Sequence, residues 1–311
     1  MKKIGKLLLK SLLGLFVLFN IMVIFHAYKL THFYDAASVA AEKAAPKTGW
    51  SKAAAIFMGA KAPKAVNIAP DTAVQNITLT AANRLKLSAW HLPASPSKGT
   101  VALFHGHGSK KSALLGEAAV FRKLGYSTLL VDFRAHGNSE GNACTIGYEE
   151  AEDVKLAYDY LVKHGEKNIV LYGASLGAAT ITKAVNDYAL QPQKVILEMP
   201  FASLYDAVKG RLKIMNLPQQ PLAAMLTFWG GTMHGFVAFN LRPAEYVKKM
   251  PCPVLLQWGR NDPRVSLAET EKIYRNIPSG KKLVVYENSG HESYLKREPL
   301  KWTNEVSAFL Q

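Results

Sequence analysis

Short apolar runs alternate with helical stretches through most of the chain, and this alternation constrains the fold more than any other feature. Five runs rich in Val, Ile, Leu and Phe lie at residues 100–105, 127–133, 168–173, 194–199 and 253–258. Strands that are buried on both faces of a parallel sheet have this composition. Helical patterns occupy stretches between the runs, at residues 112–125, 149–165 and 175–190. Strands that alternate with helices predict an α/β domain with a doubly wound, mostly parallel sheet flanked by helices.

Further segments extend this predicted sheet at both ends. Residues 74–80 and 84–92 alternate apolar and polar side chains, which predicts a hairpin of half-exposed strands. Residues 281–286 form another apolar strand before a final helix. We therefore expect one domain over residues 74–311. Because ligands of such sheets bind at the carboxyl ends of the strands, candidate functional residues are sought there.

The N-terminal segment has a different character. Residues 11–28 contain no Asp, Glu, Lys or Arg and are mostly Leu, Ile, Val, Phe and Met. A helix over residues 7–28 would be about 33 Å long, enough to cross a bilayer core. Residues 1–30 are thus predicted to form an N-terminal transmembrane anchor, followed by a helical stalk over residues 31–73. The alternatives are a signal peptide cleaved near residues 38–40, although the apolar run exceeds a normal one, and a buried core helix.

The net charge of +15 is the abnormal number in the composition, and much of it belongs to the anchor and stalk. Residues 1–70 hold ten Lys, no Arg and two acids, which is +8 of that charge. Four lysines precede the apolar run and Lys29 follows it, with more between residues 43 and 52. The positive-inside rule then predicts a cytoplasmic N-terminus, with the domain on the opposite, periplasmic or extracytoplasmic side. The charge points to a membrane surface, and no aromatic and basic stripe suggests nucleic acid.

The sequence Gly173-Ala174-Ser175-Leu176-Gly177 follows an apolar strand and opens a helix. In this context G-x-S-x-G is typical of a nucleophile on a tight, strained turn. The turn exposes the serine hydroxyl, and the glycines lack side chains that would clash. The helix N-terminus also offers N–H groups to a developing oxyanion. Ser175 is therefore the predicted nucleophile, and the alternative is a glycine-rich packing turn.

A nucleophilic serine needs a base, and the chain has nine histidines. His291 lies in the loop after the strand at residues 281–286, at the sheet edge to which Ser175 points, and is the predicted general base. Asp262, in the loop after the run at 253–258, is predicted to orient its imidazole. Glu198 is the alternative acid, although it would also serve to fix the loop that follows it.

These residues, in the order Ser175, Asp262, His291, together with His105-Gly106-His107-Gly108, resemble the α/β-hydrolase superfamily over roughly residues 74–311. The resemblance implies a serine hydrolase without a cofactor, whose oxyanion donors are the backbone N–H groups of His107 and Leu176. A family motif is also present at residues 132–139, with Ala135 where the family often has Gly. His105 and His107 resemble a metal pair as well, but we favour a loop-fixing role and expect no metal, because no carboxylate-rich partner lies nearby.

Residues 201–250 are predicted to form a helical cap over the site. Within them, residues 214–241 contain no Asp, Glu, Lys or Arg, and prolines and glycines argue against a second membrane span. Two interpretations remain open: the cap lines an apolar acyl pocket, or its helices only pack onto the domain.

The sequence as a whole predicts a membrane-anchored serine hydrolase that cleaves a carboxylic ester or thioester of an apolar, lipid-like acyl substrate. We expect no nucleic acid and no obligate protein partner. One alternative is a prolyl-peptidase-like serine peptidase, which the lack of acids in residues 214–241 disfavours. Another is a catalytically inactive binding module, which the intact Ser, Asp and His disfavour. The sequence leaves open whether Cys144 and Cys252 form a disulfide or stay free.

Overall fold

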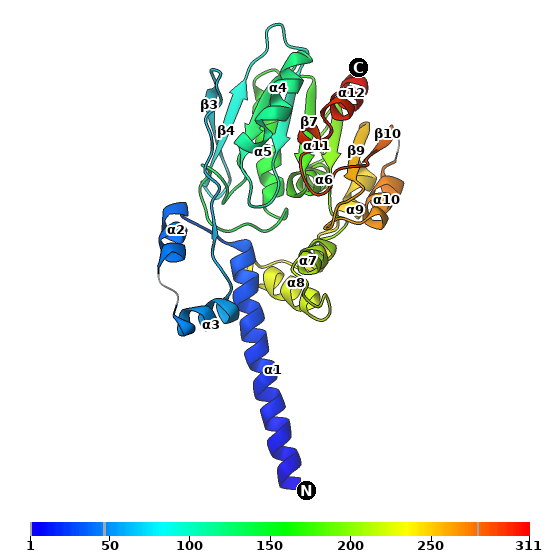
Figure 1. Ribbon diagram of the computed structural model, residues 1–311. Coiled ribbons are helices and arrows are strands. Elements are labelled where there is room, and N and C mark those ends of the chain that lie inside the picture. Colours follow the sequence, from blue (N-terminus) through cyan, green and yellow to red (C-terminus); the bar gives the residue numbers. More distant parts are fainter. Residues whose placement is uncertain (1, 46–47, 279) are drawn as a thin grey trace.

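A computed structural model describes residues 2–45, 48–278 and 280–311 of the chain. Its centre is an eight-stranded sheet in the order β10-β9-β8-β7-β5-β6-β4-β3 (Figure 1). The strands are β3 (Gln75–Thr80), β4 (Lys86–Leu92), β5 (Thr100–Phe104), β6 (Ser127–Val131), β7 (Ile169–Ala174), β8 (Lys194–Glu198), β9 (Val254–Gly259) and β10 (Lys281–Tyr286). All of them run parallel except β4, which is antiparallel to both of its neighbours. The predicted hairpin and parallel sheet are confirmed.

Helices cover both faces of this sheet. One face packs against α4 (Leu115–Lys123), α11 (Tyr294–Arg297) and α12 (Pro299–Leu310), and a short 3-10 helix, η1 (Lys111–Leu114), precedes α4. The other face packs against α5 (Glu150–Lys163), α6 (Leu176–Tyr188) and α10 (Leu267–Asn276). In β5, Val101 and Leu103 point to the first layer, whereas Ala102 and Phe104 point to the second. Both faces are therefore buried, which is why the central strands read as continuous apolar runs.

The N-terminal helix α1 (Lys2–Thr31) extends from the body of the molecule as a long rod (Figure 1). It is long and apolar enough to cross a membrane, a property that N-terminal signal sequences share. Its side chains are exposed from residue 3 to residue 18, but its last third packs against the domain. There Val23 and Ala27 are buried, and the Trp229 indole N–H donates to the Asn20 side-chain oxygen at 3.1 Å.

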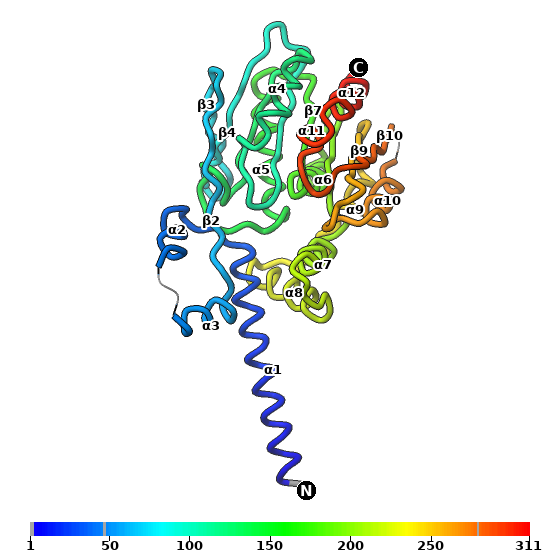
Figure 2. Tube along the Cα trace, in the orientation of Figure 1, coloured from blue at the N-terminus to red at the C-terminus, as the bar shows by residue number. Residues whose placement is uncertain are grey.

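Residues 31–73 contain α2 (Ala36–Ala44), α3 (Gly49–Met58) and the short parallel strands β1 (Phe33–Tyr34) and β2 (Ala62–Pro63). The segment returns along the base of the domain before it leads into β3 (Figure 2). The Lys64 ammonium donates to the Ser139 carbonyl oxygen at 2.7 Å, and the Asn67 amide donates to Asp132 Oδ2 at 2.7 Å. These polar contacts attach the segment to the loop after β6.

The predicted cap lies between β8 and β9. It contains α7 (Leu204–Ile214), α8 (Leu222–Met233), η2 (Ala238–Asn240), α9 (Pro243–Tyr246) and η3 (Val247–Lys249). Helix α8 lies beside the end of α1, and α7 packs against α8, at the carboxyl edge of the sheet (Figure 1). Helix α9 instead packs against α6 and α10 at the side of the sheet. The part of residues 201–250 that covers the site is therefore the α7–α8 pair.

Candidate active site

Ser175 lies between β7 and α6 in a backbone conformation that L-residues seldom adopt, with φ 52° and ψ −110°. Its N–H donates to the Glu198 carbonyl oxygen at 2.8 Å, which ties the turn to β8. Its own carbonyl oxygen accepts from the Ala179 N–H at 3.0 Å and so begins α6. The strained turn that the G-x-S-x-G sequence predicts is therefore present.

Close packing of α6 on the sheet leaves no room for a side chain at the two outer glycines of this sequence. A Cβ on Gly177 would collide with the carbonyl oxygen of Phe104 at the end of β5. A Cβ on Gly173 would come within 2.5 Å of the Ala178 backbone nitrogen. Any side chain at either position would push α6 away from the sheet and move Ser175 with it.

Ser175, His291 and Asp262 form a continuous chain of hydrogen bonds. The Ser175 hydroxyl lies 3.0 Å from His291 Nε2, and His291 Nδ1 lies 2.8 Å from Asp262 Oδ2. The other Asp262 carboxylate oxygen accepts the backbone N–H groups of Arg264 at 2.7 Å and Val265 at 3.0 Å. The Asp262 side chain is fully buried, so its orientation is fixed. The structure thus brings together the three predicted residues in the geometry of a nucleophile, a base and an orienting acid.

Glu198, the alternative acid, lies elsewhere. Its buried carboxylate accepts from the Trp302 indole N–H and from the Gln257 side-chain amide, beneath the sheet edge and out of contact with His291. Burial, together with the nearby Glu117 carboxylate, raises the pKa of Glu198 to about 8. Glu198 is therefore a structural acid that is protonated at neutral pH.

The two predicted oxyanion donors flank Ser175. Leu176 is the first residue of α6, where a backbone N–H has no acceptor within its own helix. His107 belongs to the loop after β5. In that loop Gly106 runs close to the nucleophile, since a Cβ on Gly106 would lie 3.6 Å from Ser175 Cβ. Both N–H groups therefore belong to segments that border the serine, as an oxyanion hole requires.

Buried histidines fix this loop. His105 Nε2 accepts from the Phe133 N–H at 3.2 Å, and its Nδ1 bonds the Gly106 carbonyl oxygen at 2.8 Å. His136 Nε2 similarly accepts from the Gly108 N–H at 3.0 Å. Burial lowers the pKa of His105 and of His107 to about 3, so both rings are neutral. With both ring nitrogens of His105 engaged, the arrangement fits the loop-fixing interpretation, and the described residues contain no cluster suited to a metal ion.

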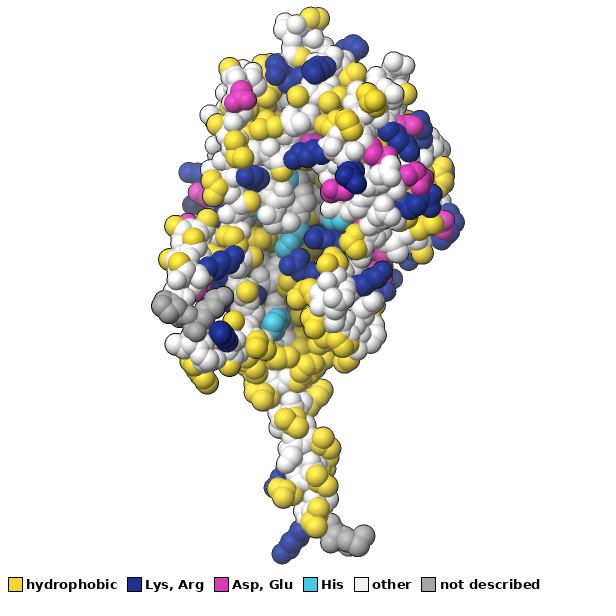
Figure 3. Space-filling model, in the orientation of Figure 1, with side chains coloured by type: hydrophobic (Ala, Val, Ile, Leu, Met, Phe, Trp, Pro, Cys, Tyr) yellow, Lys and Arg dark blue, Asp and Glu magenta, His cyan; other side chains and the backbone are white. Residues whose placement is uncertain are grey.

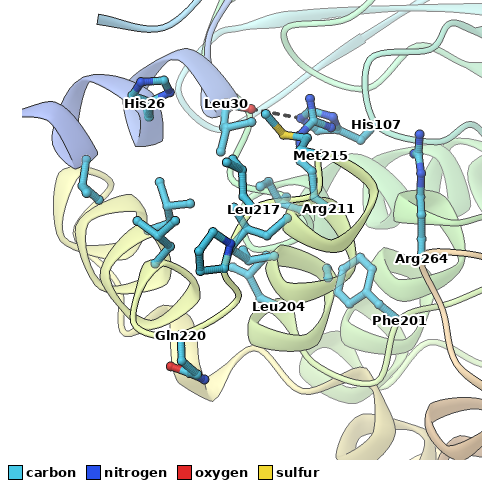
Figure 4. A pocket seen from close by; sticks show the side chains of 18 of the residues that line it. His26, Leu30, His107, Phe201, Leu204, Arg211, Met215, Leu217, Gln220 and Arg264 are labelled. Carbon is cyan, nitrogen blue, oxygen red and sulfur yellow. Dashed lines mark hydrogen bonds between the residues drawn. The ribbon is translucent and has the colours of Figure 1, made fainter. Parts of the chain in front are cut away.

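A cavity of about 660 Å³ opens above Ser175 and His291. Much of its wall comes from α7 with the α7–α8 connection, the start of α8 and the last turns of α1, and the loops after β5 and β9 add further residues. The α1 contribution consists of Phe19, Met22, Val23, His26 and Leu30. In Figure 4 the His107 ring reaches the Leu30 carbonyl oxygen, a contact of 3.2 Å that joins the oxyanion loop to α1. The cap thus forms an apolar pocket, as one of the two open interpretations expected.

Two kinds of residue at this site were not predicted from the sequence. The first is the group from α1, because none of the three interpretations of the apolar run, a membrane span, a signal peptide or a buried core helix, places it at the site. The second is a pair of arginines, Arg211 in α7 and Arg264 in the loop after β9, which line the same cavity. Figure 3 shows a hollow near the centre of the drawn face of the molecule, where basic and histidine side chains gather. The signal available in the sequence was the position of Arg264, two residues after Asp262.

The two cysteines are free thiols, so they do not form the disulfide that the sequence left open. Burial raises the pKa of the Cys144 thiol well above its usual value and that of Cys252 to about 12. Both thiols are therefore protonated and unreactive at neutral pH.

Comparison with known proteins agrees with this fold. Residues 95–234 match the family model described as serine aminopeptidase, S33. The uncharacterized protein YqkD of Bacillus subtilis is 26% identical over 215 residues, which are 68% of this chain and 70% of that protein. The lysophosphatidylserine lipase ABHD12 of Danio rerio is 27% identical over 174 residues, 53% of this chain and 43% of that protein.

Among solved structures, the esterase Pf2001 of Pyrococcus furiosus superposes with a TM-score of 0.66 at 23% sequence identity. The match covers 80% of this chain and 97% of the esterase. The parallel sheet, the strand-to-helix turn at Ser175 and these likenesses together define the class of an α/β hydrolase. The chain therefore has the α/β-hydrolase fold.

Proposed function

We propose that this protein is a membrane-anchored serine esterase that cleaves the carboxylic ester or thioester of a lipid-like, single-chain acyl substrate. The observation that carries the proposal is the hydrogen-bonded chain Ser175–His291–Asp262 at the floor of an apolar cavity. The likeness to an esterase and to a lipase agrees with it. A cavity of about 660 Å³ also lies within the range that holds small amphiphilic ligands.

The proposed reaction has two steps. Ser175 Oγ attacks the acyl carbonyl carbon while its proton passes to His291 Nε2. The N–H groups of His107 and Leu176 stabilise the oxyanion, and Asp262 stabilises the imidazolium. The alcohol or thiol then leaves with the proton from His291, and an acyl-Ser175 ester remains. Water, deprotonated by His291, releases the carboxylic acid and restores the serine.

The position of the cavity suggests where the substrate comes from. Large apolar side chains are exposed on the elements around the end of α1, including Trp50 and Ile56 in α3 and Phe228 in α8. Figure 3 shows apolar side chains gathered at the base of the body, where α1 emerges. With α1 in a bilayer, this base would rest on the lipid surface, and the substrate would enter the cavity from the membrane.

A peptidase is the second candidate, because the matching family model describes an aminopeptidase. Such an enzyme must hold the positively charged amine of its substrate. The described residues that line the cavity include no Asp or Glu but do include Arg211 and Arg264. Two guanidinium groups would repel an ammonium group, which favours an ester substrate.

Labelling with a fluorophosphonate probe tests the proposed nucleophile. We expect the full-length wild type to label, Ser175→Ala to be inert, and Ser51→Ala, which removes an exposed serine of α3, to label normally. A series of aryl esters should then show higher kcat/KM for longer acyl chains than for acetate. A wild type that does not label, or an equally reactive Ser175→Ala variant, overturns the proposal.

For localisation, we propose that α1 stays attached, with the N-terminus in the cytoplasm and the domain on the opposite side. Retention of α1 is supported by its role as a cavity wall, because cleavage after residue 40 would remove that wall. Protease added outside cells with a sealed membrane should digest the domain. Full protection of the domain would reverse the orientation.

A further inference from the structure

Arg211 and Arg264 are the charged side chains of the cavity lining among the described residues. Arg211 projects from α7 and Arg264 from the loop that also carries Asp262. In Figure 4 both side chains extend toward the end of the cavity where His107 lies. The positive charge of each arginine lowers the pKa of His107, in addition to the larger effect of burial. The two guanidinium groups therefore share one end of the cavity, beside the oxyanion loop.

Neither of these arginines forms an ion pair with an acid in the described part of the chain. Some other guanidinium groups of the described residues are paired with acids: Arg134 bonds Glu149, Glu152 and Asp153, and Arg260 pairs with Glu287. Burial, and secondarily the charge of Arg264, lowers the pKa of Arg211. Two like charges next to each other without counter-charge are unfavourable, so their proximity needs an explanation outside the apoprotein.

The backbone holds the pair in place. A Cβ on Gly210 would collide with the Arg264 carbonyl oxygen, so a glycine at this position of α7 is what lets the helix pack directly on the Arg264 loop. That loop is itself fixed, because the Arg264 N–H donates to Asp262 Oδ1 at 2.7 Å. The distance of both arginines from the candidate triad is thus set by close backbone packing.

We propose that Arg211 and Arg264 form a binding site for the phosphate group of the substrate, whose single acyl chain occupies the apolar part of the cavity. The inference rests on the proposed esterase function and adds the chemical class of the substrate. Guanidinium groups bind phosphate oxygens through paired, charge-assisted hydrogen bonds. A phosphate with a charge between −1 and −2 also balances two arginines better than a carboxylate does.

Two substrates that differ only in the phosphate test this site. We would compare 1-oleoylglycerol 3-phosphate with 1-oleoylglycerol, using the full-length protein in neutral detergent. Arg211→Gln and Arg264→Gln should each lower kcat/KM for the phosphate ester about 10- to 100-fold. Both should leave kcat/KM for the neutral ester within about twofold. The control Arg260→Gln, which removes an exposed arginine of the same loop, should change neither substrate.

The outcomes separate the site from the esterase function. Hydrolysis of neither ester by the wild type would overturn the proposed function. Hydrolysis of both with no effect of the variants, or an equal loss on both substrates, would overturn the phosphate site alone.

A binding measurement that needs no turnover uses the non-hydrolysable, ether-linked analogue of the phosphate ester, with oleate and inorganic phosphate as competitors. The analogue should bind the wild type at least tenfold more tightly than it binds either variant. If oleate shows the same dependence on the arginines, the site binds the acid product. If inorganic phosphate binds as tightly as the analogue, the site is for free phosphate. Either result overturns the lipid-phosphate assignment.

Discussion

Ser175 is held in a strained conformation by residues that contribute nothing to the chemistry. A non-glycine residue at φ 52°, ψ −110° costs about 1–3 kcal/mol. The hydrogen bond from its N–H to β8 and the close packing of Gly173 and Gly177 offset this cost. At the scale of single residues, contacts with the sheet therefore hold the backbone of Ser175 in a strained conformation, and this conformation positions its hydroxyl group.

The two candidate acids can be told apart by matched amide substitutions. Asp262→Asn should lower kcat for an aryl ester by about 10³- to 10⁴-fold, because an asparagine cannot stabilise the imidazolium or fix its tautomer. Glu198→Gln should retain most of the activity, since Glu198 is already neutral and contacts Trp302 instead of His291. Steady-state kinetics of the two purified variants decide the assignment. The reverse pattern of loss would make Glu198 the acid.

Glu198 also predicts a pH dependence of stability. Its pKa is about 8 in the folded protein, against an ordinary value of 4.5, because burial disfavours the charged form. The folded state therefore binds this proton more tightly than the unfolded state does. The resulting contribution to the free energy of unfolding is complete below about pH 4.5 and is lost as the pH rises to about 8. Between pH 5 and pH 8, the melting temperature in detergent should fall more steeply for the wild type than for Glu198→Gln. Parallel curves would contradict the raised pKa.

At the scale of elements, the first turn of α6 approaches the sheet so closely that position 177 has no room for a side chain. Gly177→Ala should reduce fluorophosphonate labelling at least tenfold and destabilise the fold by more than about 1 kcal/mol, because its Cβ would meet the Phe104 carbonyl. Gly230→Ala in α8 is the matched control, with nothing within 4 Å of its Cβ. It should stabilise the protein by about 0.5–1 kcal/mol. Equal effects of the two substitutions on the melting temperature would argue against the packing explanation.

Elements that depend on local pattern were predictable, and those that depend on packing between distant segments were not. The strand β7, the turn at Ser175 and the start of α6 follow from an apolar run, a glycine-flanked serine and a helical pattern within one short stretch. The return of residues 31–73 along the domain depends on contacts such as Asn67 with Asp132, which no local pattern encodes. The proximity of Arg211 and Arg264 could not be predicted from the sequence for the same reason, because it depends on the close packing of Gly210 against the Arg264 backbone.

At the scale of the whole molecule, α1 serves both as the apolar rod of Figure 2 and as part of the cavity wall. These roles belong to different parts of the helix. Residues 3–18 are exposed, whereas the cavity is lined from Phe19 onward. The exposed apolar part of α1 and its cavity-lining part therefore meet within one continuous helix.

A pair of substitutions along α1 separates these two roles. Met22→Trp adds bulk inside the cavity and should lower kcat/KM for long-chain aryl esters at least tenfold while sparing the acetate ester. Leu15→Trp adds the same bulk on the exposed part of the rod and should change neither ester. If both variants shift chain-length selectivity alike, the helix acts through the surrounding detergent or lipid and not as a wall.

If α1 crosses a bilayer, as proposed, a bilayer helix forms part of the pocket wall, and this changes the meaning of substrate concentration. For a substrate that enters from the lipid, the concentration that governs turnover is its mole fraction in one leaflet and not its molar concentration in water. Added inert lipid would then slow turnover although the total amounts of enzyme and substrate stay fixed. The acid released by hydrolysis would return to the same leaflet, so that the composition of the membrane itself reports the activity of the protein.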